Sequence, residues 1–197
     1  MTKTTTTKTT KTKSFTVKSL PQLPKNPFVF EVLDLVSRQR AKSKKIEVLR
    51  KYDDQSLRRI LIWNFDNSIQ SILPVGEVPY VGYDENVTYS GTLSTKLTEE
   101  IRQMHDRGSF SVGASDKQGH TTIRRESKNF YHFVRGGNDA MSNIRRETMF
   151  INILQGLHPL EAEIVVLAKD GKLSDKYKIT KEIVSEAYPS IVWGDRR

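Results

Sequence analysis

The sequence predicts an all-α protein, a compact bundle of about seven or eight helices with a loop-rich central insertion and a disordered N-terminal tail. Three observations predict this class. Apolar residues recur at helical spacing over residues 26–73 and again over 121–189. Between these blocks, residues 74–120 are rich in Gly, Pro, Ser, Thr, Asp and Tyr. Residues 1–13 are one Met, eight Thr and four Lys, a composition that cannot bury apolar surface.

The first 25 residues differ in charge from the rest of the chain. They carry six Lys and no acidic residue. A chain of 197 residues suits one ordinary domain and a tail. We therefore expect a disordered tail over residues 1–25 and a single domain over residues 26–197.

The first helical block predicts three helices. The first begins at Asn26 and the proline that follows it, because Asn caps helices and Pro suits their first turn. The second covers residues 41–51, with apolar residues inward and lysines outward. Asp53 or Asp54 caps the third, and Pro74 ends the short apolar segment that follows.

The central insertion, residues 74–120, is expected to cover part of the surface and to contain the little strand structure in the protein, as a small hairpin. A helix at residues 97–105 is expected within it, since its first turn is acidic and follows a capping residue. His105 and His120 also lie in this insertion. Neither has a second His three or four residues away, so we predict no metal site.

The last helical block predicts four helices and a returning C-terminus. A helix from residue 121 ends at Gly136, and the next begins at Asp139 or Ser142. His158 starts an apolar helix that runs into a turn at residues 169–173. After a lysine-rich link, the final helix covers residues 179–189, and Trp193 is expected to pack back on the domain.

The residue inventory gives no catalytic site. The chain has no Cys, which excludes disulfides, thiol catalysis and Cys–zinc sites. It has neither a phosphate loop nor a dinucleotide-binding glycine motif. Glu161 and Glu163 are two residues apart at a helix start, so they face different sides and are expected to favour the helix dipole. We predict a protein without enzymatic activity or cofactor.

The charge distribution points to a polyanionic partner. The net charge is +9, and the excess lies in the tail and in two helical blocks, residues 26–73 and 121–157. A solvated helix face explains any single cation, but three clusters in one domain favour nucleic acid. Arg58 and Arg59 add to the cations of the early helices. The candidate DNA-binding residues are Lys42, Lys44, Lys45, Arg124, Arg125, Lys128, Arg145, Arg146, Lys169, Gly171, Lys172, Lys176, Lys178, Thr180 and Lys181.

Two ends of the predicted domain resemble a known family. Residues 32–36, the lysine-rich helix ending at 47–52, and residues 54–61 resemble the start of the helical N-terminal domain of ATP-dependent DNA ligases. Residues 163–191, with an apolar helix, a glycine turn, a short helix and a proline-bounded exit, look like the end of the same domain. The resemblance implies a helical module that lies along the minor groove of duplex DNA and grips its backbone.

The ligase resemblance also implies particular phosphate contacts. Carried over by position, Gly171, Lys172, Thr180 and Lys181 would touch phosphate. The ligase adenylation motif is K-x-D-G, whereas here Lys169 is followed directly by Asp and Gly. The spacer is missing and the segment lies between helices, so nick sealing is not expected.

A second resemblance is to a small uncharacterised family from tailed bacteriophages, including those of cyanobacteria. Residues 62–65 and 144–150 carry it. Together the resemblances imply a DNA-binding protein of phage DNA replication, repair or transcription, in the cytoplasm of the host. No apolar run approaches the roughly 18 residues that span a bilayer, so no membrane role is expected.

A different function remains open at this point. The protein could be an adaptor that binds a phage or host polymerase or a replisome subunit. Its contact would be the aromatic residues of the insertion, Tyr80, Tyr83, Tyr89 and Phe110. An adaptor of this kind would leave duplex DNA largely unbound at moderate salt.

Overall fold

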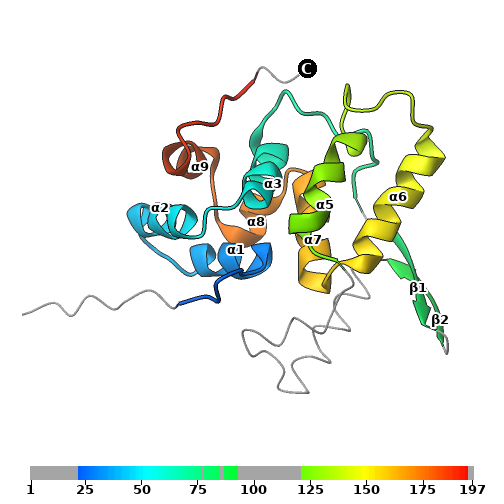
Figure 1. The fold of residues 1–197 in the computed structure, drawn as a ribbon, viewed down its shortest axis with the longest axis horizontal. Coiled ribbons are helices and arrows are strands. Elements are labelled where there is room, and N and C mark those ends of the chain that lie inside the picture. The colour runs from blue at the N-terminus through cyan, green and yellow to red at the C-terminus, as the bar shows by residue number, and fades with distance from the viewer. Residues whose placement is uncertain (1–21, 77, 85–86, 93–120, 195–197) are drawn as a thin grey trace, which may run out of the picture.

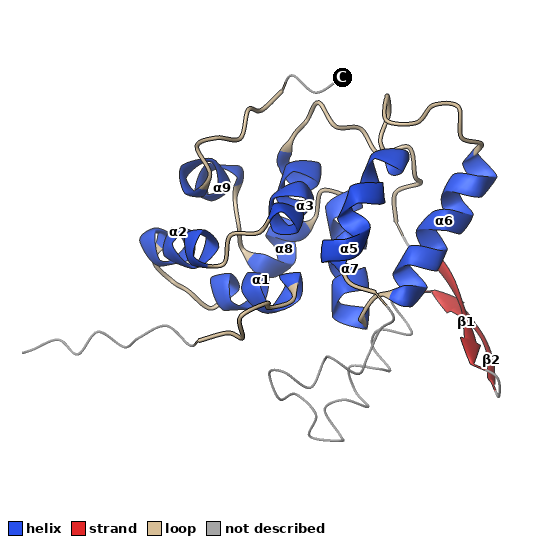
Figure 2. Cartoon of the chain, in the orientation of Figure 1, coloured by secondary structure: helices blue, strands red, loops and turns tan. Residues whose placement is uncertain are grey.

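The computed structural model describes residues 22–76, 78–84, 87–92 and 121–194 (Figure 1). In this part of the chain it contains eight α-helices, one 3-10 helix and one hairpin (Figure 2). The elements are α1 (Val29–Ser37), α2 (Lys42–Lys51), α3 (Gln55–Phe65), β1 (Pro79–Asp84), β2 (Val87–Thr92), α5 (Ile123–Glu126), η2 (Ser127–Phe133), α6 (Asn143–Gly156), α7 (Pro159–Lys169), α8 (Leu173–Tyr177) and α9 (Lys181–Ala187). The predicted all-α class is confirmed.

One apolar core joins the two helical blocks. Helix α1 packs against α2, α7 and α8, while α3 packs against α7 and α5, and α2 against α9. Helices α2 and α9 lie at one end of the molecule, and α6 lies at the other (Figure 1). The largest side chains that are almost wholly buried are Leu33, Leu49, Leu57, Ile60, Leu61, Ile123, Phe133, Phe150, Leu154, Ile164, Leu173 and Ile179.

Aromatic rings connect α3, η2 and α6 within this core. The ring centroids of Trp63 and Phe130 are 5.3 Å apart. Phe133 meets Phe150 edge-to-face at 5.0 Å. Such ring pairs stabilise the core beyond the effect of the apolar area that the rings bury. They fix η2 firmly between α3 and α6.

The small hairpin expected in the insertion is present. Strands β1 and β2 pair antiparallel, with Pro79 opposite Thr92 and Asp84 opposite Val87. The hairpin extends from the body beside α6 (Figures 1 and 2). The expected helix at 97–105, together with Phe110, His105 and His120, lies outside the described residues, as do residues 1–21 of the expected tail.

Three predicted helix starts are confirmed by their capping bonds. Oδ1 of Asp54 accepts the backbone N–H of Ser56 at 2.8 Å. The Ser142 hydroxyl accepts the N–H of the residue three positions on, at 3.4 Å. Nδ1 of His158 accepts the N–H of Leu160 at 3.1 Å. Each cap satisfies a donor that the first helical turn leaves unpaired.

The turn after α7 and the C-terminal return are also as predicted. Gly171 has a φ of +70°, a left-handed conformation that favours glycine. The N–H of Lys172 then reaches back to the carbonyl of Leu167 at 2.8 Å, which closes the helix end. The Trp193 ring packs back on α9, where the Lys181 ammonium lies 4.9 Å from the ring centroid.

Two predicted boundaries were wrong at the N-terminal side. Helix α1 begins at Val29 rather than at Asn26, because the Glu31 carboxylate accepts the N–H of Phe28 at 2.9 Å and sets the first turn there. Residues 22–25, which were assigned to the tail, are among the described residues. Leu23 packs against the core, and its N–H donates to the Tyr52 hydroxyl at 2.9 Å.

Three further predictions failed in the last block. The lysine-rich link contains helix α8, because Leu173 and Tyr177, four residues apart, are both buried. The final helix is shorter than residues 179–189. The helix predicted from residue 121 becomes the 3-10 helix η2, whose buried residues Ser127, Phe130 and Phe133 are spaced by three. That spacing matches the 3.0 residues per turn of a 3-10 helix.

Candidate nucleic-acid interface

Three predicted DNA-binding residues are buried and support the fold instead. The Lys45 ammonium donates to the carbonyl of Lys178 at 2.5 Å, and the Lys169 ammonium donates to the carbonyl of Pro74 at 2.6 Å. Arg146 is 3% exposed. Their predicted outward positions were wrong, because carbonyls at chain turns need buried donors and these long side chains reach them.

The Arg146 guanidinium holds the loop between η2 and α6. It donates to the carbonyl of His132 at 2.7 Å, to the carbonyl of Asn138 at 2.8 Å and to Oδ1 of Asn143 at 2.8 Å. These bonds leave no side of the fork free for a phosphate. Arg146 therefore orders the segment that precedes α6.

Replacing Arg146 by Ala is expected to lower the free energy of unfolding by about 3 kcal/mol, since three part-buried acceptors lose the charged donor of a buried side chain. Arg145 is the matched control, because it is adjacent in sequence and exposed. Its replacement by Ala should change stability by less than about 0.5 kcal/mol. Urea denaturation followed by circular dichroism measures both, and equal effects of the two changes would contradict this role.

Four more candidates are exposed but paired with carboxylates. Lys42 contacts Glu186 at 2.7 Å, Lys44 contacts Glu47 at 2.7 Å and Arg124 contacts Asp54 at 3.1 Å. Lys176 pairs with Glu163. A hydrogen bond from Lys42 to Glu186, and the attraction between their charges, raise the pKa of Lys42. To bind DNA, each of these four cations would have to leave its carboxylate partner and contact a phosphate instead.

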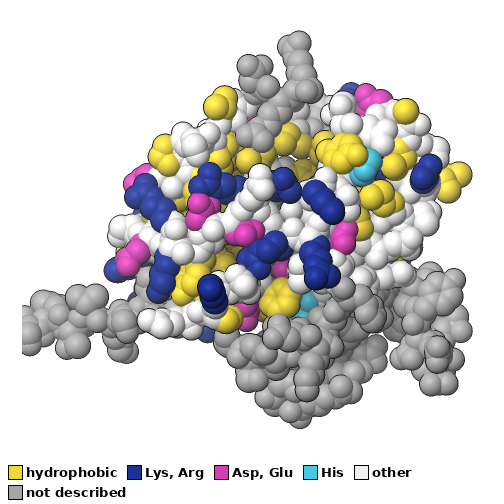
Figure 3. Space-filling model, viewed as in Figure 1, with side chains coloured by type: hydrophobic (Ala, Val, Ile, Leu, Met, Phe, Trp, Pro, Cys, Tyr) yellow, Lys and Arg dark blue, Asp and Glu magenta, His cyan; other side chains and the backbone are white. Residues whose placement is uncertain are grey.

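The other candidate cations have no carboxylate within ion-pair distance among the described residues. They are Arg125, Lys128, Arg145, Lys172, Lys178 and Lys181. Two lie on α5 and η2, one on α6 and three around α8 and α9. Gly171 and Thr180 are exposed beside the last three. Dark-blue side chains spread over one face from α2 to α5, with acidic ones between them (Figure 3). The fifteen predicted residues therefore do not share one uninterrupted basic surface.

Two of the exposed cations without a carboxylate partner among the described residues lie on α5 and η2. Arg125, Lys128 and Tyr131 are all exposed and are spaced by three. A second set with the same spacing, Ser127, Phe130 and Phe133, is buried in the core. A 3-10 helix places residues i and i+3 one above the other. Lys128 and Tyr131 of η2 are related in this way, and Arg125 of α5 precedes Lys128 by three residues. We call the two cations, Arg125 and Lys128, the α5–η2 row.

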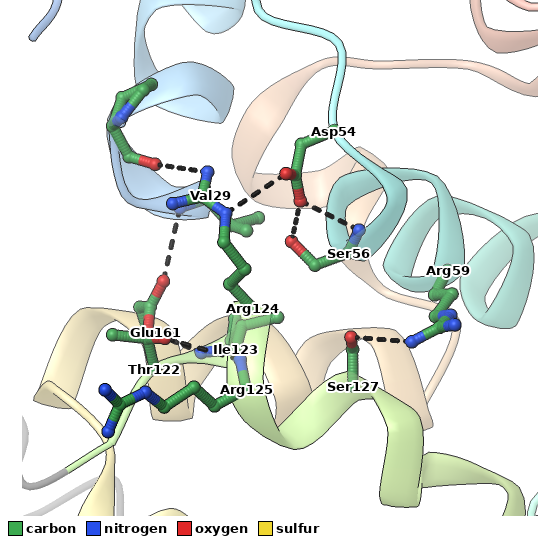
Figure 4. Close-up of polar contacts among 11 residues, drawn as sticks. Val29, Asp54, Ser56, Arg59, Thr122, Ile123, Arg124, Arg125, Ser127 and Glu161 are labelled. Atoms are coloured by element: carbon green, nitrogen blue, oxygen red, sulfur yellow. Dashed lines mark hydrogen bonds and ion pairs between the residues drawn. The ribbon is translucent and has the colours of Figure 1, made fainter. Parts of the chain in front are cut away.

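Arg59 of α3 also lies beside η2, although it was not among the candidate DNA-binding residues. Its guanidinium donates to the hydroxyl of Ser127 at 3.1 Å, which fixes it beside η2 (Figure 4). Sequence spacing could not reveal this contact, because the two residues are 68 positions apart. The only sequence signal for a role of Arg59 was that α3 carries two adjacent arginines, Arg58 and Arg59.

A buried carboxylate anchors the start of α5. Glu161 is 1% exposed. Its Oε1 accepts the N–H of Val29 at 3.2 Å, and its Oε2 accepts the N–H of Ile123 at 2.9 Å (Figure 4). Val29 and Ile123 are the first residues of α1 and α5. One side chain of α7 therefore ties together the starts of two helices that are far apart in sequence.

Arg124 adds a second anchor for α5. Besides its bond to Asp54, it donates to the carbonyl of Pro27 at 3.4 Å. Figure 4 shows Arg124 between Asp54 and Glu161, with Arg125 directed away from both. The guanidinium of Arg124 thus connects α5 to α3 and to the segment before α1, and Arg125 stays open to solvent.

Burial shifts the pKa of two groups at the start of α7. Burial raises the pKa of Glu161 to about 7, against the opposing effect of its two N–H donors. Burial lowers the pKa of His158 to about 4. The His158 ring also stacks on Phe30, with centroids 4.9 Å apart. Both residues support the fold, and the predicted capping role of His158 is confirmed.

A groove lies between η2 and α6, next to the α5–η2 row. Its volume is about 1150 Å³. It is open to solvent and has a mixed lining of apolar, amide, hydroxyl and imidazole side chains with one carboxylate, Glu126, and one guanidinium, Arg145. The lining residues are Thr121, Glu126, His132, Asn138, Ala140, Met141, Ser142, Arg145, Thr148, Met149, Asn152 and Ile153.

The described residues do not point to a metal site or to a membrane span. They contain no group of three or more His, Cys, Asp or Glu side chains placed to hold a metal ion. No helix in the described ranges has the length and apolar character needed to cross a membrane. The basic segment and the adjoining groove are the candidate site that remains.

These features define a small, basic, helical protein with a cationic face over α3 and α5. The chain belongs to a family of unknown function, DUF6433, whose model matches residues 32–117 and 108–175. No curated protein and no solved structure gives a significant match to the chain.

Proposed function

We propose that this protein is a non-enzymatic DNA-binding protein that grips the sugar–phosphate backbone of duplex DNA. One observation carries the proposal. Arg125 and Lys128 are exposed, lie three residues apart across the junction of α5 and η2, and have no carboxylate partner in the described part of the chain. Cations that need not leave a carboxylate are the ones that bind phosphate most readily.

Rigidity supports the same proposal. Arg59 is held by Ser127, and the start of α5 is held by Glu161. A backbone-binding surface gains affinity when its cations are positioned before the ligand arrives, because less motion is lost on binding. Contacts of this kind position DNA without reading bases, so binding should be weakly sequence-specific.

The proposal also includes the cellular process in which the protein acts. The resemblance of both ends of the domain to the helical module of DNA ligases favours a duplex lying across the helices. The resemblance of residues 62–65 and 144–150 to proteins of tailed phages favours a role in phage DNA replication, repair or transcription. The ligand would then be phage DNA in the cytoplasm of the host, with a phage or host replication or transcription protein as a further partner.

Charge reversal on the row is the test. The double change Arg125→Glu and Lys128→Glu should weaken duplex binding by about tenfold or more, since two phosphate contacts become repulsive. Fluorescence anisotropy with a labelled 20-base-pair duplex measures the affinity. Both side chains are exposed, so the thermal transition should be unchanged.

The matched control is Lys172→Glu with Lys181→Glu, which changes the net charge equally in the C-terminal region that the ligase resemblance favoured. It should weaken binding less than the first pair. An unchanged affinity in the first pair would contradict the proposal for the α5–η2 row. A loss confined to the second pair would move the interface to α8 and α9.

The adaptor function remains the second candidate, and one observation favours it. The β1–β2 hairpin extends from the body beside α6, where Ile144 is 80% exposed. Tyr80, Tyr83 and Tyr89 belong to this hairpin. An adaptor would give background anisotropy with duplex DNA at moderate salt, whereas the DNA-binding function gives a saturable signal.

A further inference from the structure

We infer that the groove between η2 and α6 takes an unpaired base, so that the preferred ligand is a duplex with a single-stranded extension. This inference rests on the proposed DNA-binding function and names the form of DNA that the same site prefers. The α5–η2 row would hold the backbone, and the strand would pass from Lys128 over Tyr131 into the groove.

The first support is an exposed aromatic ring at the end of the cationic row. Tyr131 is 49% exposed, although most aromatic rings on η2 are buried in the core. It follows Lys128 by three residues, one turn of a 3-10 helix. Proteins that bind single strands combine a cationic track with aromatic rings on which bases stack, because every base has a π face.

The second support is that the ring environment is fixed. The His132 ring lies against Tyr131, with centroids 3.9 Å apart. His132 is in turn held by the Asn138 amide, whose nitrogen is 2.9 Å from Nδ1. The Arg146 fork binds the carbonyls of His132 and Asn138. The platform is therefore held by part-buried hydrogen bonds on both sides of His132.

The groove beyond the ring suits a base and its sugar. His132 lines it, together with two methionines, Met141 and Met149, and the amides of Asn138 and Asn152. Methionine adapts to flat aromatic surfaces, and amides can pair with base edges. At about 1150 Å³ the groove exceeds the roughly 300–1,000 Å³ typical of small-molecule pockets, and its open shape fits a strand.

Charge decides between a strand and an apolar peptide as the occupant. Arg145 lies in the groove lining and has no ion-pair partner among the described residues. Lys128 lies on η2 outside the lining, so one cation lies at the groove and one lies on the adjoining helix. The acidic residue of the lining, Glu126, already accepts hydrogen bonds from the Thr121 hydroxyl and the Asn129 amide. A polyanion gains from both charges, whereas an uncharged peptide would gain from neither.

The test compares three DNA probes by anisotropy: a blunt duplex, the same duplex with a five-nucleotide single-stranded extension, and the extension alone. The extended duplex should bind about tenfold more tightly than the blunt one, within the range for one stacked base. Tyr131→Ala should remove this gain and leave the blunt-duplex affinity unchanged. Tyr131→Phe should retain the gain, since the ring face remains.

A second readout uses 2-aminopurine in the extension, whose fluorescence should fall when wild-type protein binds and should not fall with Tyr131→Ala. Equal affinity for blunt and extended duplexes, or full binding by Tyr131→Ala, would overturn the inference. Neither result would touch the proposed function, because the blunt duplex would still bind. Absence of salt-dependent binding to all three probes would instead overturn the proposed function.

Discussion

Replacing Glu161 by Ala is expected to lower the free energy of unfolding by about 3 kcal/mol or more. The carboxylate accepts the first N–H of α1 and the first N–H of α5. Each buried donor left without an acceptor costs about 1–3 kcal/mol, and the shortened side chain also leaves a cavity. Urea denaturation at pH 5, where the carboxyl of Glu161 is largely neutral, measures the loss.

Glu163 provides the matched control on the same helix. It is partly exposed and pairs with Lys176 at the surface. Surface ion pairs contribute about 0–1 kcal/mol, so Glu163→Ala should have a small effect. If the two changes destabilised the protein equally, Glu161 could not be the anchor of α1 and α5. Because α5 carries Arg125, Glu161→Ala should also weaken duplex binding at temperatures where it remains folded.

The second large effect concerns pH, because two groups at the start of α7 titrate in opposite senses. Glu161 has a folded pKa of about 7 against an ordinary value of 4.5. Its folded state binds the proton more tightly, so its contribution to stability is complete below pH 4.5 and is lost as the pH rises to 7. The slope is about −1.4 kcal/mol per pH unit within that window.

His158 has the opposite sign. Its folded pKa is about 4 against an ordinary value of 6.5. The unfolded state binds the proton more tightly, so its contribution is complete above pH 6.5 and is lost as the pH falls to 4. Protonation at Nδ1 would also break the cap that accepts the N–H of Leu160. Between pH 4.5 and 6.5 the two slopes oppose each other, and these two groups together leave stability nearly constant.

Two variants separate these slopes. Glu161→Gln removes the first titration, so stability should rise with pH by about 1.4 kcal/mol per unit between pH 4.5 and 6.5. His158→Asn removes the second and keeps a capping side chain, so stability should fall with pH over the same window. Urea midpoints across this pH range give the measurement. The same slope in both variants would show that these groups do not titrate as described.

Local sequence signals predicted the helix starts and the glycine turn well. The caps of Asp54 and His158 act within two residues, and Gly171 needs only its own backbone conformation. The 3-10 helix was not predicted, although the spacing of Phe130 and Phe133 by three is visible in the sequence. A spacing of three occurs in α-helices as well, so it did not distinguish the two forms.

The candidate site was harder to predict because its features depend on contacts distant in sequence. Glu161 reaches Val29 across 132 positions and Ile123 across 38. Lys42 was predicted as a free cation, but α2 packs on α9 and brings Glu186 to it. Charge alone identified Arg125 and Lys128, whereas the exposure of Tyr131 follows from how η2 packs.

The dependence of duplex affinity on salt tests the central claim most directly. The logarithm of the binding constant of the full chain should fall linearly and steeply with the logarithm of the salt concentration, as expected for binding that releases counterions from phosphates. The double change Arg125→Glu and Lys128→Glu should reduce this slope by about two. Duplex binding that is absent at low salt, or a slope that the double change leaves intact, would contradict a backbone-binding surface on α5 and η2.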